Sequence, residues 1–484
     1  MHFAVIQAFD QGLYRGGLIT GGLKPAVDFK LLFHLDFSRV ITPTHAEHEA
    51  IKLCALRVLV VNKKLLASDV SKPLYIRYNL PLFDIDFTRG NMSIKLSNRV
   101  QAVKPSPTLA ITARAAQMRA AGKDIIGLGA GEPDFDTPDH IKAAAIKAID
   151  SGYTKYTAVD GIASLKKAII AKYKNDNGLD YQANQILVSC GGKQSSFNLT
   201  QALLNAGDEV IIPAPFWVSY PDMVLLADGV PVIIETTQAQ NFKISPEQLR
   251  AAITDKTRLI FINSPSNPSG VAYNLEELKA IGDVLKDFPN IIIATDDMYE
   301  HILWKKGTFV NILNAHPDLY DRTVVMNGVS KAYSMTGWRI GYAAGPADLI
   351  EAMCTIQSQS TSNPTSISQH AAEAALTGDQ SFIDDMCVEF KKRHDYVVAE
   401  LNSIDGVECL ETDGTFYVFP NVEKLIAGLD NIDDDLGFSE YLIEQAGVAL
   451  VPGSAFGTPG HIRISIATSM ANLQNAMERI KKAI

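Results

Sequence analysis

Short apolar runs rich in β-branched residues alternate with segments of helical periodicity between about residues 137 and 346. Five of these runs read DEVIIPAP, VPVIIETT, TRLIFINSP, NIIIATDD and RTVVMNGVS, and they begin at residues 208, 230, 257, 290 and 322. Their continuous apolar character indicates strands that are buried on both faces. Strands separated by helices predict a mostly parallel sheet flanked by helices, which is an α/β fold. In such sheets, ligands bind at the carboxyl ends of the strands.

The segment from Thr137 to Gly152 has the pattern of an amphipathic helix. Thr137 is the expected N-cap, Pro138 the first helical residue, and Gly152 the stop signal. The buried face is expected to consist of Ile141, Ala145, Ala148 and Ile149. A second helix is predicted directly after Ser245, which starts a capping box.

Residues 1–91 lack this alternation of strands and helices. They are either a small accessory domain or an upstream extension of a protein whose translation starts at Met92, and we favour the second interpretation. A DNA-binding module is not expected there, because no pair of short amphipathic helices with a basic second helix is recognisable.

The composition is that of a water-soluble globular protein. Of the 484 residues, 47% are hydrophobic and 20% are charged, and the formal net charge is −10. Acidic and basic residues are interspersed, so we expect small-molecule partners and no nucleic acid. No apolar run has the length of a membrane span and no convincing signal-peptide core is present, so we expect a cytoplasmic protein. Buried free thiols and no metal site are expected for the cysteines, which are Cys54, Cys190, Cys354, Cys387 and Cys409.

Functional side chains follow several of the predicted strands. The glycine turn Gly191–Gly192 precedes Lys193 and a helix that is expected to end at Gly207. Free backbone N–H groups at such a helix start are typical of phosphate sites, although an ordinary tight turn has the same pattern. The other strand ends carry Asn267, Asp296, Asp297, Tyr299, Ser330 and Lys331. Turn chemistry explains Asn-Pro and Asp-Asp pairs, but it does not explain a phenol, a carboxylate, an amide and a lysine at one sheet edge.

The stretch VSKAYSMTGWRIGYAAGP places Lys331 and Arg339 in Gly-rich, apolar surroundings. A lysine that forms a Schiff base must spend time as the neutral amine, and a guanidinium can bind a phosphate with two parallel hydrogen bonds. Taken alone, the stretch also fits two ordinary cations whose stems pack on apolar neighbours.

Ordered motifs between Met92 and Ile484 resemble those of class I aminotransferases of the aspartate aminotransferase family, most closely the bacterial aspartate type. The motifs are GLGAGEPDFDTP, KYT, GGKQ, SPSNPSG, DDMYEH, SKAYSMTGWRIGY and RISIATS. The resemblance implies a fold-type-I transferase with a mostly parallel central sheet and a smaller α+β domain. It also implies pyridoxal 5′-phosphate as the cofactor, and amino transfer from L-aspartate to 2-oxoglutarate by a ping-pong mechanism.

The resemblance further implies a set of cofactor contacts. Lys331 would hold the cofactor as a Schiff base, Asp296 would pair with the pyridine nitrogen, and Arg339 would bind the phosphate. Tyr299 and Asn267 would donate hydrogen bonds to the phenolic oxygen of the ring. The remaining contacts would be the phosphate-binding Gly191, Gly192, Lys193 and Ser330, the stacking Trp217, and Tyr156, which would reach the phosphate of the other subunit in a homodimer.

The implied substrate site comprises Gly131, Lys193, Trp217, Asn267 and Arg463. Arg463 would bind the α-carboxylate, assisted by the backbone of Gly131, and the freed amine of Lys331 would carry the α-proton. Ser358 stands where the animal and enterobacterial branch has an arginine for the distal carboxylate of aspartate. Lys193 is therefore our candidate for that second carboxylate, and its alternative role is to neutralise the phosphate.

The family fold implies a large cofactor-binding domain of residues 142–385 and a small domain of residues 92–141 and 386–484. Ser362 and Asn363 would lie near the subunit boundary. Two other functions stay open. One is an aromatic or prephenate aminotransferase in which Arg99 or Lys104 approaches the substrate, and the other is a ligand-sensing regulator with this fold. The absence of a recognisable DNA-binding segment argues against the regulator.

Overall fold

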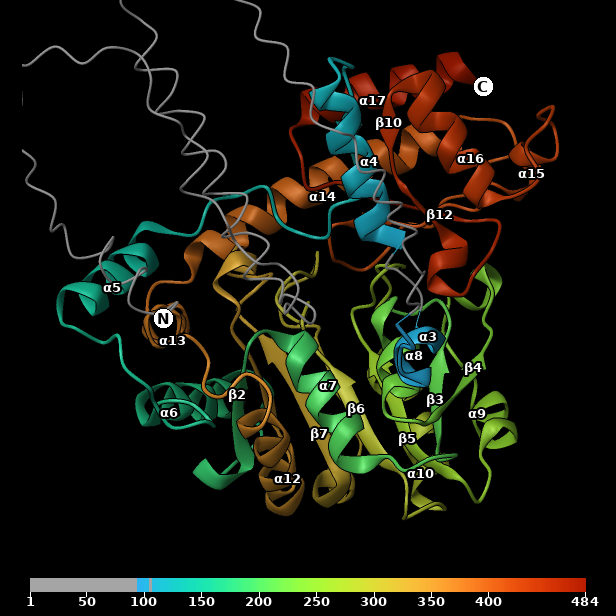
Figure 1. Cartoon of the computed structure of the whole chain (residues 1–484). Helices are drawn as coiled ribbons and strands as arrows, with labels where there is room; N and C mark the ends of the chain where they lie inside the picture. The colour runs from blue at the N-terminus through green and yellow to red at the C-terminus, as the bar shows by residue number, and fades with distance from the viewer. Residues whose placement is uncertain (1–93, 104–106) are drawn as a thin grey trace, which may run out of the picture. The chain divides into compact units, whose positions relative to one another are not determined.

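The structure is a computed structural model that describes residues 94–103 and 107–484, which belong to one compact unit (Figure 1). The extension predicted for residues 1–91, as well as Met92, Cys54 and Lys104, lies outside the described residues, so those expectations stay predictions. Within the described part of the chain, no helix is long and apolar enough to cross a membrane.

A seven-stranded sheet has the strand order β2-β8-β7-β6-β5-β3-β4 (Figure 1). β8 pairs antiparallel with β2 and β7, and the remaining neighbours pair in parallel. The strands are β2 (Ile186–Ser189), β3 (Glu209–Pro213), β4 (Val230–Ile234), β5 (Thr257–Asn263), β6 (Ile292–Asp296), β7 (Thr323–Gly328) and β8 (Gly341–Ala344). The predicted α/β class is therefore confirmed, and each of the five apolar runs contains one of these strands.

Helices cover both faces of the sheet. Successive side chains of a strand point to opposite faces, so Leu259 and Phe261 of β5 lie in one core and Ile260 and Ile262 in the other. The first core includes residues of α7 (Gly192–Leu203), α8 (Ser219–Leu226) and α12 (Ala347–Ser358). The second includes residues of α5 (Asp139–Asp150), α6 (Ala163–Lys172), α9 (Pro246–Ala252), α10 (Leu275–Lys286), α11 (Ile312–Ala315) and α13 (Ser366–Thr377).

Helix α5 forms where the sequence predicts it, but its start and its buried face differ from the prediction. Pro138 is the N-cap and makes no side-chain cap. Thr137 is used elsewhere, because its Oγ1 donates to the backbone oxygen of Ser334 at 2.6 Å. Ile149 is 54% exposed. It lies about 80° around the helix from Ile141, at the margin of the stripe that packs on α13.

The other two predicted helix boundaries have different outcomes. The capping box of Ser245 is confirmed, because its Oγ accepts a hydrogen bond from the backbone N–H of Gln248 at 3.2 Å. Helix α7 ends at Leu203, earlier than predicted, because Leu204 is already extended. Gly207 has a φ of +87° and lies in the turn that leads to β3.

Segments from both ends of the described chain combine in two smaller sheets. β1 (Ile126–Gly127) pairs in parallel with β10 (Val448–Ala449). An antiparallel sheet contains β11 (Val451–Pro452), β12 (Ile462–Ser465) and β9 (Tyr417–Val418). The helices of these segments are α3 (Asn98–Ala102), α4 (Pro107–Ala120), α14 (Ser381–Asn402), α15 (Glu423–Ile426), α16 (Asp435–Tyr441) and α17 (Met470–Ala483). The pairing of β1 with β10 fits the predicted small domain, whose boundaries stay a prediction.

The four cysteines in the described part of the chain are free: Cys190, Cys354, Cys387 and Cys409. Only Cys409 is buried, and the other three are partly exposed. The expectation of free thiols is met for these four, whereas the expectation of full burial was wrong for three of them, which lie at a strand end and on two helices.

Candidate active site

A cavity of about 390 Å³ lies at the carboxyl ends of β5, β6 and β7, where residues from the smaller sheets close it. Its lining includes eleven residues predicted from the sequence: Gly131, Gly192, Lys193, Trp217, Asn267, Asp296, Tyr299, Ser330, Lys331, Arg339 and Arg463. The volume lies in the range of pockets that hold cofactors and small ligands.

Lys331 follows the end of β7, and its side chain is enclosed by protein except where it meets the cavity. Nζ donates to the backbone oxygen of Gly131 and lies 5.8 Å from the ring centre of Phe416. Burial, followed by the positive charge of Arg463, lowers the pKa of Lys331 to about 8. A substantial fraction of this amine is therefore neutral near physiological pH, as a nucleophilic lysine requires.

Asp296 is the last residue of β6 and points into the cavity. Its Oδ2 accepts a hydrogen bond from the Tyr220 hydroxyl at 2.5 Å, and its Oδ1 accepts one from the backbone N–H of Met298 at 3.3 Å. Tyr220 is fixed by stacking on Phe261, with ring centres 4.4 Å apart. Burial raises the pKa of Asp296, and the hydrogen bond from Tyr220 opposes this shift. The carboxylate is thus held in one orientation towards a ligand in the cavity.

The turn between β2 and α7 has the geometry of an anion cradle. Gly191 has a φ of +86° and precedes the first turn of α7. The N–H of Gln194 donates to the oxygen of Gly191 at 3.0 Å, and the helix start before it is the kind of place where backbone N–H groups bind an anion. The φ of Gly191 favours glycine, and a Cβ on Gly191 would lie 2.3 Å from Nη2 of Arg339 and so displace its guanidinium. Arg339 is held by the backbone oxygens of Thr336, at 2.9 Å, and Cys190, at 3.2 Å. Its remaining donors can bind a phosphate together with the helix start.

Arg463 on β12 is only 2% exposed. Its Nη1 donates to Oδ1 of Asn267 at 2.9 Å, and its Nη2 donates to the backbone oxygen of Gly129 at 2.7 Å. The guanidinium lies 4.4 Å from the ring centre of Tyr417. Among the described residues, no carboxylate pairs with it and its Nε has no partner. Because a buried cation without an anion is costly, this geometry indicates a binding site for an anionic ligand group.

Lys193 and Trp217 lie side by side at the cavity. Nζ of Lys193 is 5.0 Å from the ring centre of Trp217. Partial burial of its amine, followed by the charge of Arg339, lowers the pKa of Lys193, and the charge of Asp222 acts in the opposite direction. The placement suits both roles considered for Lys193, contact with a phosphate and contact with a second carboxylate.

The loop that carries Gly131 and Glu132 is fixed on both sides. The buried Arg393 of α14 donates to Oδ1 of Asp134 at 2.7 Å. On the cavity side, Oγ1 of Thr336 donates to Oε2 of Glu132 at 2.9 Å. These contacts hold the backbone of Gly131 over Lys331.

Four residues considered from the sequence do not line this cavity, and one of them is Gly191, whose turn lies beside Arg339 at its edge. Tyr156 is 91% exposed, so its predicted role would need a second subunit and stays a prediction. Ser358 ends α12, where its Oγ donates to the backbone oxygen of Thr355 at 2.7 Å. Arg99 forms an exposed ion pair with Asp228, with a distance of 2.5 Å between Nη2 and Oδ2, so the proposal that it approaches the substrate finds no support in this placement.

Several lining residues were missed by sequence reasoning. Asn263 ends β5, donates to the backbone oxygen of Asp296 at 2.9 Å, and accepts from the N–H of Asn267 at 2.8 Å. The rule that functional residues follow strands could have found it. Tyr417, whose hydroxyl lies 3.0 Å from that of Tyr299, comes from β9 in a different sheet, and no local signal marks it.

Comparisons with known proteins agree with this geometry. A family model for aminotransferase class I and II matches residues 123–480. The aspartate/prephenate aminotransferase of Nitrosomonas europaea is 62% identical over 392 residues, which cover 80% of this chain and 99% of that protein. Its counterpart in Cereibacter sphaeroides is 54% identical over 390 residues, covering 80% and 98%.

Solved structures give the same result. An aspartate aminotransferase from Rhizobium meliloti has a TM-score of 0.78 and 48% identity, covering 81% of this chain and 98% of its own. Aspartate aminotransferase from Thermus thermophilus with maleate has a TM-score of 0.76 and 41% identity, covering 81% and 100%. With its cavity, its sheet and these relatives, the chain belongs to the class I and II aminotransferase family.

Proposed function

We propose that the protein transfers the amino group of L-aspartate to 2-oxoglutarate and uses pyridoxal 5′-phosphate as its cofactor. The observation that carries the proposal is that Arg463, buried without a carboxylate partner among the described residues, lines the same cavity as Lys331, whose pKa is lowered to about 8. A guanidinium that needs an anion and an amine that is partly neutral are what an α-amino acid substrate and a carbonyl cofactor require.

The cavity residues fit pyridoxal 5′-phosphate. The cradle of Gly191, Gly192 and Arg339 suits its phosphate, and the φ of +86° favours glycine at position 191. Asp296 offers a carboxylate for the pyridine nitrogen, and Lys331 offers the amine for the carbonyl carbon. When bound, the cofactor supplies an electron-withdrawing ring that delocalises the electron pair left on the substrate α-carbon.

The side chains of the protein then direct the reaction. Arg463 binds the α-carboxylate and so orients the Cα–H bond for cleavage. Nζ of Lys331, in its neutral form, accepts the α-proton and later returns a proton to complete the amino transfer. The first half-reaction converts L-aspartate to oxaloacetate, and the second converts 2-oxoglutarate to L-glutamate. Lys193 is our candidate for binding the distal carboxylate of both dicarboxylic substrates.

A second substrate, prephenate, is favoured by the names of the relatives. The Nitrosomonas and Cereibacter proteins, at 62% and 54% identity, are both named aspartate/prephenate aminotransferase. Prephenate also carries two carboxylates, so the cations proposed for aspartate suit it as well. We further propose a homodimer in which Tyr156 completes the phosphate site of the second copy, because this phenol is 91% exposed in one chain.

The proposal is tested by reduction with borohydride. The purified protein should have an absorption band at the edge of the visible range, and reduction should remove it and fix the cofactor to the peptide that contains Lys331. The Lys331→Ala variant should not be labelled and should lose turnover of aspartate with 2-oxoglutarate. Labelling of another lysine, or turnover by the variant, would exclude the assignment.

A further inference from the structure

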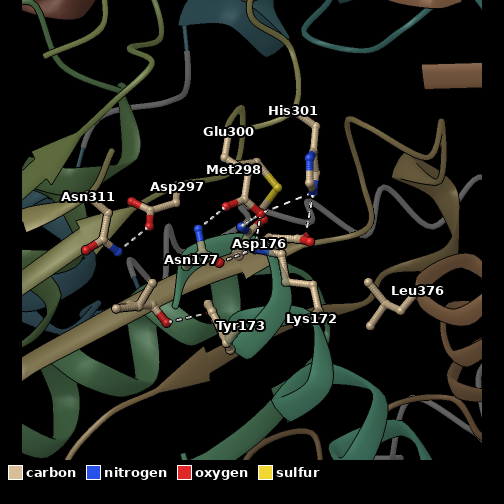
Figure 2. Close-up of polar contacts among 12 residues, drawn as sticks. Lys172, Tyr173, Asp176, Asn177, Asp297, Met298, Glu300, His301, Asn311 and Leu376 are labelled. Carbon is tan, nitrogen blue, oxygen red and sulfur yellow. Dashed lines mark hydrogen bonds and ion pairs between the residues drawn. The ribbon is translucent and has the colours of Figure 1, made fainter. Parts of the chain in front are cut away.

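A second buried polar cluster lies next to the end of β6 and outside the cavity (Figure 2). Its centre is Glu300, whose side chain is 3% exposed. Oε1 of Glu300 forms an ion pair with Nζ of Lys172 and accepts from Nδ2 of Asn327 at 2.8 Å. Oε2 accepts from Nδ2 of Asn177 at 2.8 Å. We call Lys172, Asn177, Glu300 and Asn327 the Glu300 cluster.

The cluster is attached to the turn that carries two proposed cofactor contacts. The backbone N–H of Glu300 donates to the oxygen of Asp297 at 2.9 Å, and that of Ile302 donates to the oxygen of Tyr299 at 2.8 Å. These bonds close two overlapping turns after β6, Asp297–Glu300 and Tyr299–Ile302, and Asp296 directly precedes the first of them. A shift of Glu300 would therefore move both side chains in the cavity.

The same carboxylate is attached to the strand that leads to Lys331. Asn327 belongs to β7, and its Oδ1 accepts from the backbone N–H of Gly328 at 2.7 Å. Lys331 follows shortly after this point. Glu300 thus connects the end of β6 with the end of β7 through one side chain.

Lys172 makes the burial of this carboxylate tolerable. Its side chain is 2% exposed, and Nζ also donates to Oδ1 of Asn177 at 2.7 Å. A π-helical turn, Tyr173–Asn177, follows α6 and brings Lys172 and Asn177 together. Such turns often occur at functional sites. Tyr173 ties this turn to β7, because its hydroxyl donates to the backbone oxygen of Val325 at 3.1 Å.

The Glu300 cluster does not have the charge arrangement of a metal-binding site. Asp176, Glu300 and His301 offer ligand atoms within 4.8 Å of one another (Figure 2). However, the ammonium of Lys172 is in contact with Oε1 of Glu300 and 3.9 Å from Oδ2 of Asp176. A lysine cation at this place repels a second cation and already neutralises the carboxylate.

We propose that Glu300, neutralised by Lys172, is a positioning residue for transamination that fixes the β6 turn with Asp296 and Tyr299 relative to the β7 end with Lys331. This inference rests on the proposed function. Misplacement of catalytic groups by about 1 Å costs about 100-fold in rate, so the loss of this connection should reduce kcat more than it changes KM.

The test compares Glu300→Gln with the double variant Lys172→Met/Glu300→Leu. Glu300→Gln leaves Lys172 with only the more distant carboxylate of Asp176, 3.9 Å away, and is expected to lower the melting temperature. The double variant replaces the ion pair by apolar side chains and so leaves no unpaired charge between them, although the amides of Asn177 and Asn327 lose their partners. Its melting temperature is therefore measured beside its kinetics, to separate positioning from folding. Lys243→Met/Glu277→Leu is the matched control, because it removes a remote, partly buried ion pair of 2.8 Å.

For the double variant we expect kcat for aspartate to fall about tenfold or more, with KM changed less than about threefold. We also expect the pH midpoint of the visible absorption band to shift by about half a unit or more, because the band reports how Lys331 and Asp296 face the cofactor. The control should match the wild type in kcat and in this midpoint.

The outcomes separate the inference from the proposed function. If the double variant keeps both the wild-type kcat and the wild-type midpoint, Glu300 is only structural and the inference is overturned. If the wild type itself has no reducible band and no turnover of aspartate, the proposed function fails instead. If the double variant does not fold, kcat and the pH midpoint of the visible band are measured for Glu300→Gln below its melting temperature. Wild-type values of both would then overturn the inference.

Discussion

Two groups of charged side chains lie near the end of β6, one around the buried Arg463 and the other around the buried Glu300, and they are organised in opposite ways. In the cavity, Lys331, Arg339 and Arg463 form no ion pair with any residue in the described part of the chain, and backbone or amide oxygens accept their hydrogen bonds. In the Glu300 cluster, Lys172 contacts a carboxylate directly, and every oxygen of that carboxylate accepts an amide hydrogen bond.

The contrast distinguishes binding from support. Burial without a counter-ion leaves a cation in need of a ligand, and it lowers the pKa of Lys331. Burial with a counter-ion satisfies both charges, so the pair needs no charged ligand. Substitution of a cavity cation should therefore mainly reduce enzyme activity, whereas substitution of the paired Lys172 should mainly reduce the stability of the fold.

The largest expected effect comes from Arg463→Met. Loss of the carboxylate clamp should reduce kcat/KM for every amino donor by about 2–5 kcal/mol, or about 30- to 5,000-fold. The free energy of unfolding should fall by only about 1–3 kcal/mol, because the change leaves the oxygens of Asn267 and Gly129 without a donor but leaves no buried anion unpaired. Lys172→Met should have a larger effect on stability and lower the free energy of unfolding by about 3–5 kcal/mol.

Denaturant titrations and steady-state kinetics of both variants check this prediction. Arg463→Met would contradict it by unfolding as easily as Lys172→Met, since that result would make Arg463 a structural residue. A donor-selective loss would assign Arg463 to a side-chain contact and not to the α-carboxylate.

The sheet and the residues at its strand ends were predictable from the sequence. Lys331, Asp296 and Asn267 come from short apolar strands whose exits mark one edge of a parallel sheet. Their roles came from the resemblance to a family, because no local pattern tells a Schiff-base lysine from a surface lysine. The residues that hold them in place were harder to predict from the sequence. Tyr220, which donates a hydrogen bond to Asp296, lies in a helix with no unusual sequence feature.

Residues that depend on distant packing were not predictable. Tyr417 reaches Tyr299 from β9, and Glu300 meets Lys172 only because a π-helical turn follows α6. The burial of Ile149 was predicted wrongly for a related reason, since the width of a helix's covered face depends on the neighbour that packs on it.

The second effect is a pH dependence of cofactor attachment. Only the neutral amine reacts with a carbonyl, so the rate at which cofactor-free protein forms a Schiff base with pyridoxal 5′-phosphate should rise with pH around the pKa of Lys331, about 8. A pKa of about 8 gives roughly a tenfold rise between pH 7 and pH 9. Arg463 is one cause of the lowered pKa, so Arg463→Met should move the midpoint upwards.

Stopped-flow absorbance at a series of pH values measures these midpoints. A wild-type midpoint above about 9.5 would mean that the cavity does not depress the pKa of Lys331 as described. An unchanged midpoint in Arg463→Met would show that burial alone is responsible and that the cavity cations do not influence one another.

The smallest effect is expected from Lys193→Ser, because this side chain is exposed at the cavity and is the least enclosed of its lysines. If Lys193 binds the distal carboxylate, kcat/KM for aspartate and glutamate should fall about two- to fivefold, within the range of a solvent-screened ion pair. For a neutral or aromatic donor, kcat/KM should be almost unaffected. Lys167→Ser, which removes an exposed lysine of α6, should leave kcat/KM unchanged for every donor.

The alternative role in phosphate binding has a different signature, because the cofactor serves every substrate. An equal loss for all donors, together with faster cofactor release on dialysis, would assign Lys193 to the phosphate with Arg339. The distal carboxylate would then need another cation, and Lys104 would be the next residue to replace.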